Sequence, residues 1–226
     1  MKIIAHRGLS AKYPENTLLA FRKALEEGAD GIETDLRLSS DDEVILFHDD
    51  DLEHITGLGG APEALTLAAL KKLDAGEGEK IPSLDELLQL TQGKATLILE
   101  IKYNSATYKR LCERVAEKIK DKPEWVEVSC FNDKVLEYMH QLDPRIKLHK
   151  IINSASVLED EILERRYGYV SYFDVDVALR KHVLQKGLMQ RHKVIFWVVS
   201  REDMRKEEEA GLYGIMVNDI GSENLI

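Results

Sequence analysis

Two acidic residues on one short apolar run, Glu33 and Asp35, are the first sign of chemistry in this sequence. They lie within residues 31–38, which have the composition of a β-strand, and residues two apart on a strand share one face with about 6.6 Å between their Cα atoms. Two carboxylates buried on one face need a neutralising partner. A divalent cation provides one, and an all-carboxylate set suits Mg²⁺ or Ca²⁺ rather than zinc. The alternative is that both face solvent near the end of the strand.

A second charged pair, Glu100 and Lys102, shares one face of the run 95–102. The residues ahead of the pair are apolar, so the two charges end a run that otherwise predicts a buried strand. Glu100 could complete the carboxylate set of the cation, and Lys102 could hold an anionic oxygen of a substrate. The alternative is an ion pair within the sheet that binds no ligand.

Two histidines stand at the ends of further strand-like runs. His6 and Arg7 close the first run, and His48 and Asp49 close the third. Two imidazoles suit phosphodiester cleavage, because one can deprotonate the attacking oxygen while the other protonates the leaving alkoxide. Asp49 could orient His48 or cap the segment that follows. A solvent-exposed histidine at a strand end is the alternative for each.

Trp197 lies within the apolar run 194–199, where its ring is either part of the core or a wall of the pocket against the carbon atoms of a substrate. Asn132 follows the strand-like run 125–130 and is less informative, because Asn is common in turns. The remaining histidines have no matching partners in the sequence and are interpreted as surface or structural residues: His54, His140, His149, His182 and His192.

Strand-like runs alternate with helical segments along the chain, which predicts a parallel sheet with crossover helices. The expected strands are 2–6, 31–38, 43–48, 95–102, 125–130, 145–151, 169–173, 194–199 and 214–217. The expected helices are 16–27, 65–73, 84–90, 106–120, 133–141, 156–167, 177–186 and 201–210. Nine strands are one more than an eightfold barrel needs. Only residues 39–42 join the second and third, too few for a crossover helix, so we expect a local hairpin there.

These elements predict a (β/α)8 TIM barrel formed by residues 1–226 as a single domain. The segment 49–80 is rich in glycine and is expected to be a small insertion after the third strand, forming a rim or lid element. Catalytic residues of such barrels lie at the carboxyl ends of the strands, where the charged positions above fall. No internal repeat and no linker between two domains is visible in the sequence.

The composition narrows the choice of partners. The formal net charge is −10, which does not suit a polyphosphate backbone, so we expect a small-molecule substrate and no nucleic acid. Cys112 and Cys130 are widely separated and are expected to be buried or half-buried free thiols. No signal peptide and no integral membrane segment is predicted, which favours the cytoplasm. The oligomeric state cannot be predicted from the sequence.

Taken together, these residues resemble the glycerophosphodiester phosphodiesterase family. Five motifs occur in the family's order: His6-Arg7-Gly8, Pro14-Glu15-Asn16-Thr17, Gly31-x-Glu33-x-Asp35, His48-Asp49 and Glu100-Ile101-Lys102. Weaker similarities extend over nearly the whole chain, for example at Ser129-x-Phe131-Asn132 and Phe196-Trp197-Val198-Val199. The order of the motifs is more specific than any one of them.

The resemblance implies metal-dependent hydrolysis of glycerophosphodiesters to glycerol 3-phosphate and an alcohol, with one divalent cation, Mg²⁺ or Ca²⁺. The glycerol 2-hydroxyl could attack first, giving a cyclic phosphate that water then opens. The insertion 49–80 corresponds to one that family members carry over the site. The resemblance implies that the metal ligands are Glu33, Asp35 and Glu100. It implies that the acid/base pair is His6 and His48, and that the cations that bind the phosphate are Arg7 and Lys102.

Departures from the family's pattern lie outside these motifs. The usual Leu-x-Arg-Thr becomes Leu52-Glu53-His54-Ile55-Thr56, and the usual Trp-Thr-Val-Asn becomes Trp197-Val198-Val199-Ser200. The sequence therefore does not define which alcohol group the substrate carries, and a phosphodiesterase acting on lysophospholipids or glycerophosphoinositol is an alternative. Another is a non-catalytic barrel that binds phosphodiesters, although every proposed catalytic position is retained. The apolar residues of the insertion could form a lid core or a surface that touches lipid: Leu52, Ile55, Leu58, Ala61 and Leu65.

Overall fold

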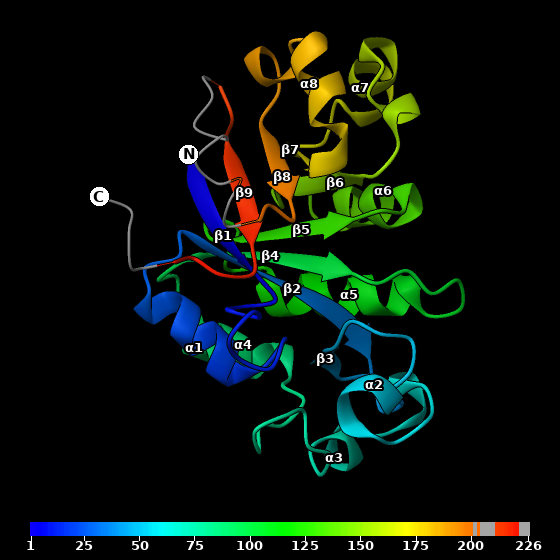
Figure 1. Ribbon diagram of the computed structural model, residues 1–226. Coiled ribbons are helices and arrows are strands. Elements are labelled where there is room, and N and C mark those ends of the chain that lie inside the picture. The colour runs from blue at the N-terminus through cyan, green and yellow to red at the C-terminus, as the bar shows by residue number, and fades with distance from the viewer. Residues whose placement is uncertain (201–202, 204–210, 222–226) are drawn as a thin grey trace.

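Eight parallel strands close into a barrel (Figure 1) in the computed structural model, which describes residues 1–200, 203 and 211–221. The barrel strands are β1 (Lys2–His6), β2 (Gly31–Leu38), β4 (Thr96–Ile101), β5 (Val126–Cys130), β6 (Leu148–Ile152), β7 (Tyr172–Asp176), β8 (Val194–Trp197) and β9 (Gly214–Val217). Pairing of β1 with both β2 and β9 closes the ring. The predicted TIM barrel is thereby confirmed.

The ninth strand, β3 (Val44–Leu46), pairs antiparallel with β2 and stands outside the ring. The short connection 39–42 predicted this hairpin, because two parallel strands cannot be joined by so few residues. Side chains alternate along β3 and its continuation. Val44 and Leu46 enter the main core, whereas Ile45 and Phe47 pack into a second hydrophobic cluster.

That second cluster belongs to the segment 49–80. The segment contains α2 (Glu53–Thr56), the 3₁₀ turn η1 (Pro62–Ala64) and α3 (Leu67–Leu70), which Figure 1 shows beside β3. Leu52 and Leu70 are fully buried in this cluster, and Ile55 and Leu65 pack against it. These four residues therefore contribute to a small core of their own, whereas Leu58 and Ala61, the other members of the proposed lipid-touching set, are exposed.

The helices that follow the other strands cover the outside of the barrel. They are α1 (Leu18–Glu26), α4 (Leu84–Thr91), α5 (Tyr108–Ile119), α6 (Asp133–Leu142), α7 (Asp160–Tyr167) and α8 (Arg180–Gln185), with the 3₁₀ turns η2 (Ala155–Val157), η3 (Val177–Leu179) and η4 (Leu188–Gln190). A capping box of Ser83 and Glu86 starts α4. The expected helix 201–210 lies outside the described residues, apart from residue 203.

Cys112 of α5 and Cys130 of β5 are buried free thiols, as expected. Burial raises the pKa of each to about 12, so neither is a nucleophile at neutral pH. No helix in the described ranges combines the length and the apolar character that crossing a membrane requires.

His149 is fully buried inside the barrel between two acidic side chains. Its Nε2 lies 3.0 Å from Oε2 of Glu127, and its Nδ1 lies 3.0 Å from Oδ1 of Asp174. A neutral imidazole carries one N–H, so donation to both carboxylates requires the imidazolium. Burial opposes the charge, but the two acids outweigh it and raise the pKa of His149 to about 9. The expectation that His149 has no partners is wrong, because its partners come from strands distant in the sequence.

We predict that His149→Gln lowers the free energy of unfolding by about 3–5 kcal/mol near neutral pH, because the buried carboxyl group of Asp174 loses the cation with which it pairs, and Glu127 keeps Lys147 alone as a cationic partner. The folded pKa lies above the ordinary 6.5, so this contribution is fully present below pH 6.5 and is lost as the pH rises through about 9. Denaturant titrations of both proteins across this range measure the difference. A difference that stays constant up to pH 10 would contradict the assignment, and His182→Gln on the exposed face of α8 is the control.

Candidate active site

The carboxyl ends of β2 and β4 bring the three predicted metal ligands together. One oxygen from each of Glu33, Asp35 and Glu100 lies within 4.8 Å of the others, and all three residues are buried. Alternation along β2 sends Glu33 and Asp35 to the inside of the barrel, and the parallel register sets Asp35 beside Glu100. The shared face expected from the sequence spacing is therefore present.

Negative charge is crowded at this point. Burial, Asp35 and Glu100 raise the pKa of Glu33 well above its usual range. Burial likewise raises the pKa of Glu100 to about 7, although Lys102 opposes the shift. For Asp35 burial acts in the same direction, but Lys102 and Arg7 outweigh it and lower the pKa. Three buried carboxylates with this excess of negative charge fit a hard divalent cation such as Mg²⁺ or Ca²⁺.

Two cations border the carboxylates. Arg7 Nε lies 3.2 Å from Oδ2 of Asp35, and Lys102 Nζ lies 2.8 Å from Oδ1 of Asp35 and 2.7 Å from Oε1 of Glu100. The side chains of Arg7 and Lys102 are 19% and 16% exposed, so both reach the cavity as well as the acids. Lys102 thus makes the in-sheet pair with Glu100 that was weighed as an alternative, and it also faces the cavity.

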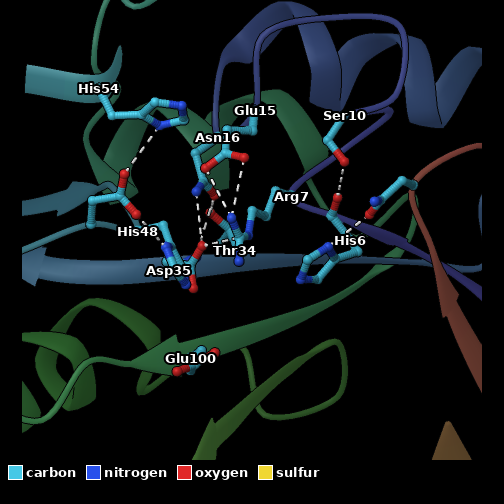
Figure 2. A network of polar contacts seen from close by, with 12 residues as sticks. His6, Arg7, Ser10, Glu15, Asn16, Thr34, Asp35, His48, His54 and Glu100 are labelled. Atoms are coloured by element: carbon cyan, nitrogen blue, oxygen red, sulfur yellow. Dashed lines mark hydrogen bonds and ion pairs between the residues drawn. The ribbon is translucent and has the colours of Figure 1, made fainter. Parts of the chain in front are cut away.

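The loop after β1 fixes these groups from a second side (Figure 2). Glu15 accepts a hydrogen bond of 3.0 Å from Arg7 Nη1, and Asn16 Nδ2 donates to Oδ2 of Asp35 at 2.8 Å. Gly8 adopts a φ of +79°, and a Cβ there would lie 2.7 Å from the backbone of Ala20, so only glycine fits. The Pro-Glu-Asn-Thr motif was known only as part of a resemblance, and the structure gives Glu15 and Asn16 positioning contacts.

The two histidines line the same cavity as the carboxylates, and Figure 2 shows Arg7 and Asp35 between them. His6 Nδ1 lies 2.8 Å from Oδ1 of Asn218, so in the tautomer that donates to this oxygen Nε2 keeps a free lone pair. Burial and Arg7 lower the pKa of His6 to about 4, which keeps it neutral at pH 7.

His48 Nδ1 lies 2.7 Å from Oδ1 of Asp49, and His54 Nδ1 lies 3.4 Å from the other oxygen of Asp49. Burial opposes ionisation of Asp49, but the hydrogen bonds and charges of His48 and His54 together outweigh burial and lower the pKa of Asp49. Asp49 therefore orients His48, and His54, which was expected to have no partner, contacts this pair from the rim.

The cavity has a volume of about 130 Å³ and extends from the carboxylates to an apolar wall. Trp197 and Phe131 form this wall, with their ring centroids 5.7 Å apart in an edge-on arrangement. The other lining residues are His6, Arg7, Glu33, His48, Glu100, Lys102, Ser129, Ile151, Asp174 and Met216. A rim hollow of about 330 Å³ adjoins it through His48 and Lys102. A hollow of about 640 Å³ near Met1 and Lys2 contains none of the candidate residues, so the chemistry locates the site in the smaller cavity.

Arg37 borders the candidate site, and none of the sequence motifs includes it. Its side chain is buried, and Nε and Nη2 donate to the carbonyl oxygen of His48 at 3.1 and 3.0 Å. Arg37 also pairs with Glu63 of η1 at 2.7 Å and with Asp50. Because Arg37 follows Glu33 and Asp35 on the same face of β2, the spacing contained the signal. One guanidinium therefore ties the backbone of His48 to the barrel and to the segment 49–80.

Known proteins that resemble this chain in sequence and in fold indicate its family. Residues 6–222 match the glycerophosphoryl diester phosphodiesterase family. A glycerophosphodiester phosphodiesterase of Caldanaerobacter subterraneus subsp. tengcongensis is 34% identical over 96% of this chain and 93% of its own length. The structure of an Oleispira antarctica phosphodiesterase in complex with the product sn-glycerol-3-phosphate superposes with a TM-score of 0.85 at 26% identity, covering 96% of this chain and 93% of that one.

A glycerophosphodiester phosphodiesterase structure from Thermotoga maritima gives a TM-score of 0.81 at 26% identity, over 97% of this chain and 95% of that one. These matches span nearly the full length of each protein. The chain therefore belongs to the glycerophosphoryl diester phosphodiesterase family.

We predict that Arg37→Lys lowers kcat for a phosphodiester about 10- to 100-fold with a small change in KM, because lysine keeps the charge but loses the fork that fixes the carbonyl of His48. Steady-state kinetics with bis(p-nitrophenyl) phosphate measure both constants. Arg110→Lys, at an exposed ion pair with Asp42, is the matched control. A kcat equal to that of the unmodified protein would show that His48 does not depend on Arg37.

Proposed function

We propose that this chain hydrolyses glycerophosphodiesters to glycerol 3-phosphate and an alcohol, using a divalent cation held by Glu33, Asp35 and Glu100. The observation that carries the proposal is one cavity lined by carboxylates, by two cations and by two imidazoles. The complex of the Oleispira antarctica relative with sn-glycerol-3-phosphate supports the product. The oxygen-only donor set favours Mg²⁺ or Ca²⁺.

In the proposed mechanism Arg7 and Lys102 hold the phosphate anion, because both reach the cavity from one edge. The cation, when bound, neutralises charge that builds on the phosphoryl oxygens. His6 is neutral, and its Nε2 accepts the proton of the attacking oxygen, which is the glycerol 2-hydroxyl or water. His48 acts from its imidazolium form, in which Nδ1–H donates to Asp49 and Nε2 donates its proton to the leaving alkoxide.

Attack by the glycerol 2-hydroxyl gives a cyclic phosphate and the free alcohol. His48 then takes a proton from water, which attacks the phosphorus atom, and His6 returns its proton to the departing glycerol oxygen. Both rings end in their starting states, so the cycle balances. We also propose that the whole chain acts as one catalytic domain in which the segment 49–80 forms a rim. Glu63 and Asp50 of that segment support this role through their ion pairs with Arg37.

We predict that Glu33→Ala and Glu100→Ala lower phosphodiesterase activity and that extra divalent metal partly restores it, because each change weakens the proposed metal site without removing an acid/base group. His6→Ala and His48→Ala should lower kcat by about 10²–10⁴-fold with no rescue. Rates with glycerophosphocholine are measured while MgCl₂ or CaCl₂ is titrated.

Controls for this series are Glu117→Ala and His182→Ala, which change exposed helical residues of the same types. Both should keep the activity of the unmodified protein. If all four active-site variants responded alike to added metal, the division into metal ligands and acid/base residues would be wrong.

A further inference from the structure

Two polar side chains line the cavity and have no part in the mechanism above: Ser129 of β5 and Asp174 of β7. We propose that they form a hydroxyl-binding subsite that selects a polyol phosphate over an alkyl phosphate of the same length. The inference rests on the proposed function and specifies which part of the substrate this end of the cavity reads.

Ser129 supplies the first observation. It is 1% exposed, and its Oγ has no hydrogen-bond partner among the described residues. Leaving a buried hydroxyl without a partner costs about 1–3 kcal/mol, so native proteins rarely retain one without a reason. Because Ser129 also lines the cavity and pairs in register with Glu100, a ligand bound beside the carboxylates can reach this hydroxyl.

Asp174 supplies the second. Its carboxyl oxygens lie 3.0 and 3.1 Å from Nδ1 of His149, whose charge is in turn compensated by Glu127. One N–H donor uses only part of the acceptor capacity of a carboxylate, so lone pairs remain for a donor in the cavity. A hydroxyl can donate to Asp174, whereas an anionic group would be repelled. This end of the cavity therefore suits the neutral part of the substrate.

The walls between these groups are apolar. Ile151, Met216 and the rings of Phe131 and Trp197 face the carbon atoms of anything bound there, and Trp197 is fixed by a hydrogen bond of 3.1 Å from Nε1 to the carbonyl oxygen of Asp174. A volume of about 130 Å³ is far below that of pockets for larger ligands, which span about 300–1,000 Å³. A short chain that carries hydroxyl groups matches both the size and the polarity.

The test compares two ligands that differ only in hydroxyl groups, sn-glycerol 3-phosphate and n-propyl phosphate. Isothermal titration with the full chain in MgCl₂ or CaCl₂ gives the Kd of each. The unmodified protein should bind glycerol 3-phosphate more tightly. Ser129→Ala should weaken its binding about 3- to 10-fold and leave the Kd of propyl phosphate unchanged, because one hydrogen bond is lost. Ser129→Thr keeps the hydroxyl and should retain the preference.

Ser171→Ala makes the same change at an exposed position before β7 and should leave both Kd values unchanged. The subsite is overturned if the unmodified protein does not distinguish the two ligands, or if Ser129→Ala weakens both equally or neither. Turnover of bis(p-nitrophenyl) phosphate, which has no hydroxyl group, checks the proposed function separately. Intact turnover with no ligand preference would reject the subsite alone, whereas no turnover of any phosphodiester would reject the proposed function.

Discussion

Repulsion among three buried carboxylates is the constraint on which the rest of the site depends. Glu33, Asp35 and Glu100 meet at the mouth of the barrel, where burial removes the water that would otherwise screen them. Each neighbouring cation or hydrogen-bond donor neutralises part of this negative charge. Arg7 and Lys102 pair with Asp35, and the backbone N–H of Arg7 donates to Oε2 of Glu33 at 3.1 Å. The remaining excess is what makes a divalent cation the fitting partner.

A second group of buried charges lies inside the barrel, and there protein side chains neutralise one another. Glu127, His149 and Asp174 come from three adjacent strands, and the imidazolium between the acids offsets their charge. The two solutions differ in consequence. The pairing of His149 with Glu127 and Asp174 stabilises the fold and leaves Asp174 with acceptor capacity toward the cavity, whereas the carboxylates at the mouth retain an excess of negative charge that fits a cation.

Much of this arrangement could be predicted from the sequence. The barrel was found because strand-like and helical segments alternate, and the hairpin because 39–42 is too short for a crossover. Glu33, Asp35 and Glu100 were found because charged residues inside apolar runs are rare and their spacing of two fixes the face. Their convergence depends on the register of β2 with β4, which the sequence does not contain.

Other parts were missed for physical reasons. The seventh strand was predicted at 169–173 but runs from Tyr172 to Asp176. The prediction ended too early because charged residues such as Asp174 are typical of loops, and Asp174 is buried in the strand only because it pairs with His149. The partners of His149 were invisible for the same reason, since they lie on neighbouring strands. Arg37 was overlooked although it shares the face of Asp35, because its target is a backbone carbonyl.

The central claim is that Glu33, Asp35 and Glu100 hold one divalent cation. Anomalous diffraction from crystals grown with MnCl₂ tests it most directly, because Mn²⁺ accepts the same oxygen ligands and scatters anomalously. The account predicts a single strong peak within bonding distance of all three carboxylates, which Glu33→Gln weakens. A peak elsewhere, or no peak at this position in saturating Mn²⁺, would contradict it.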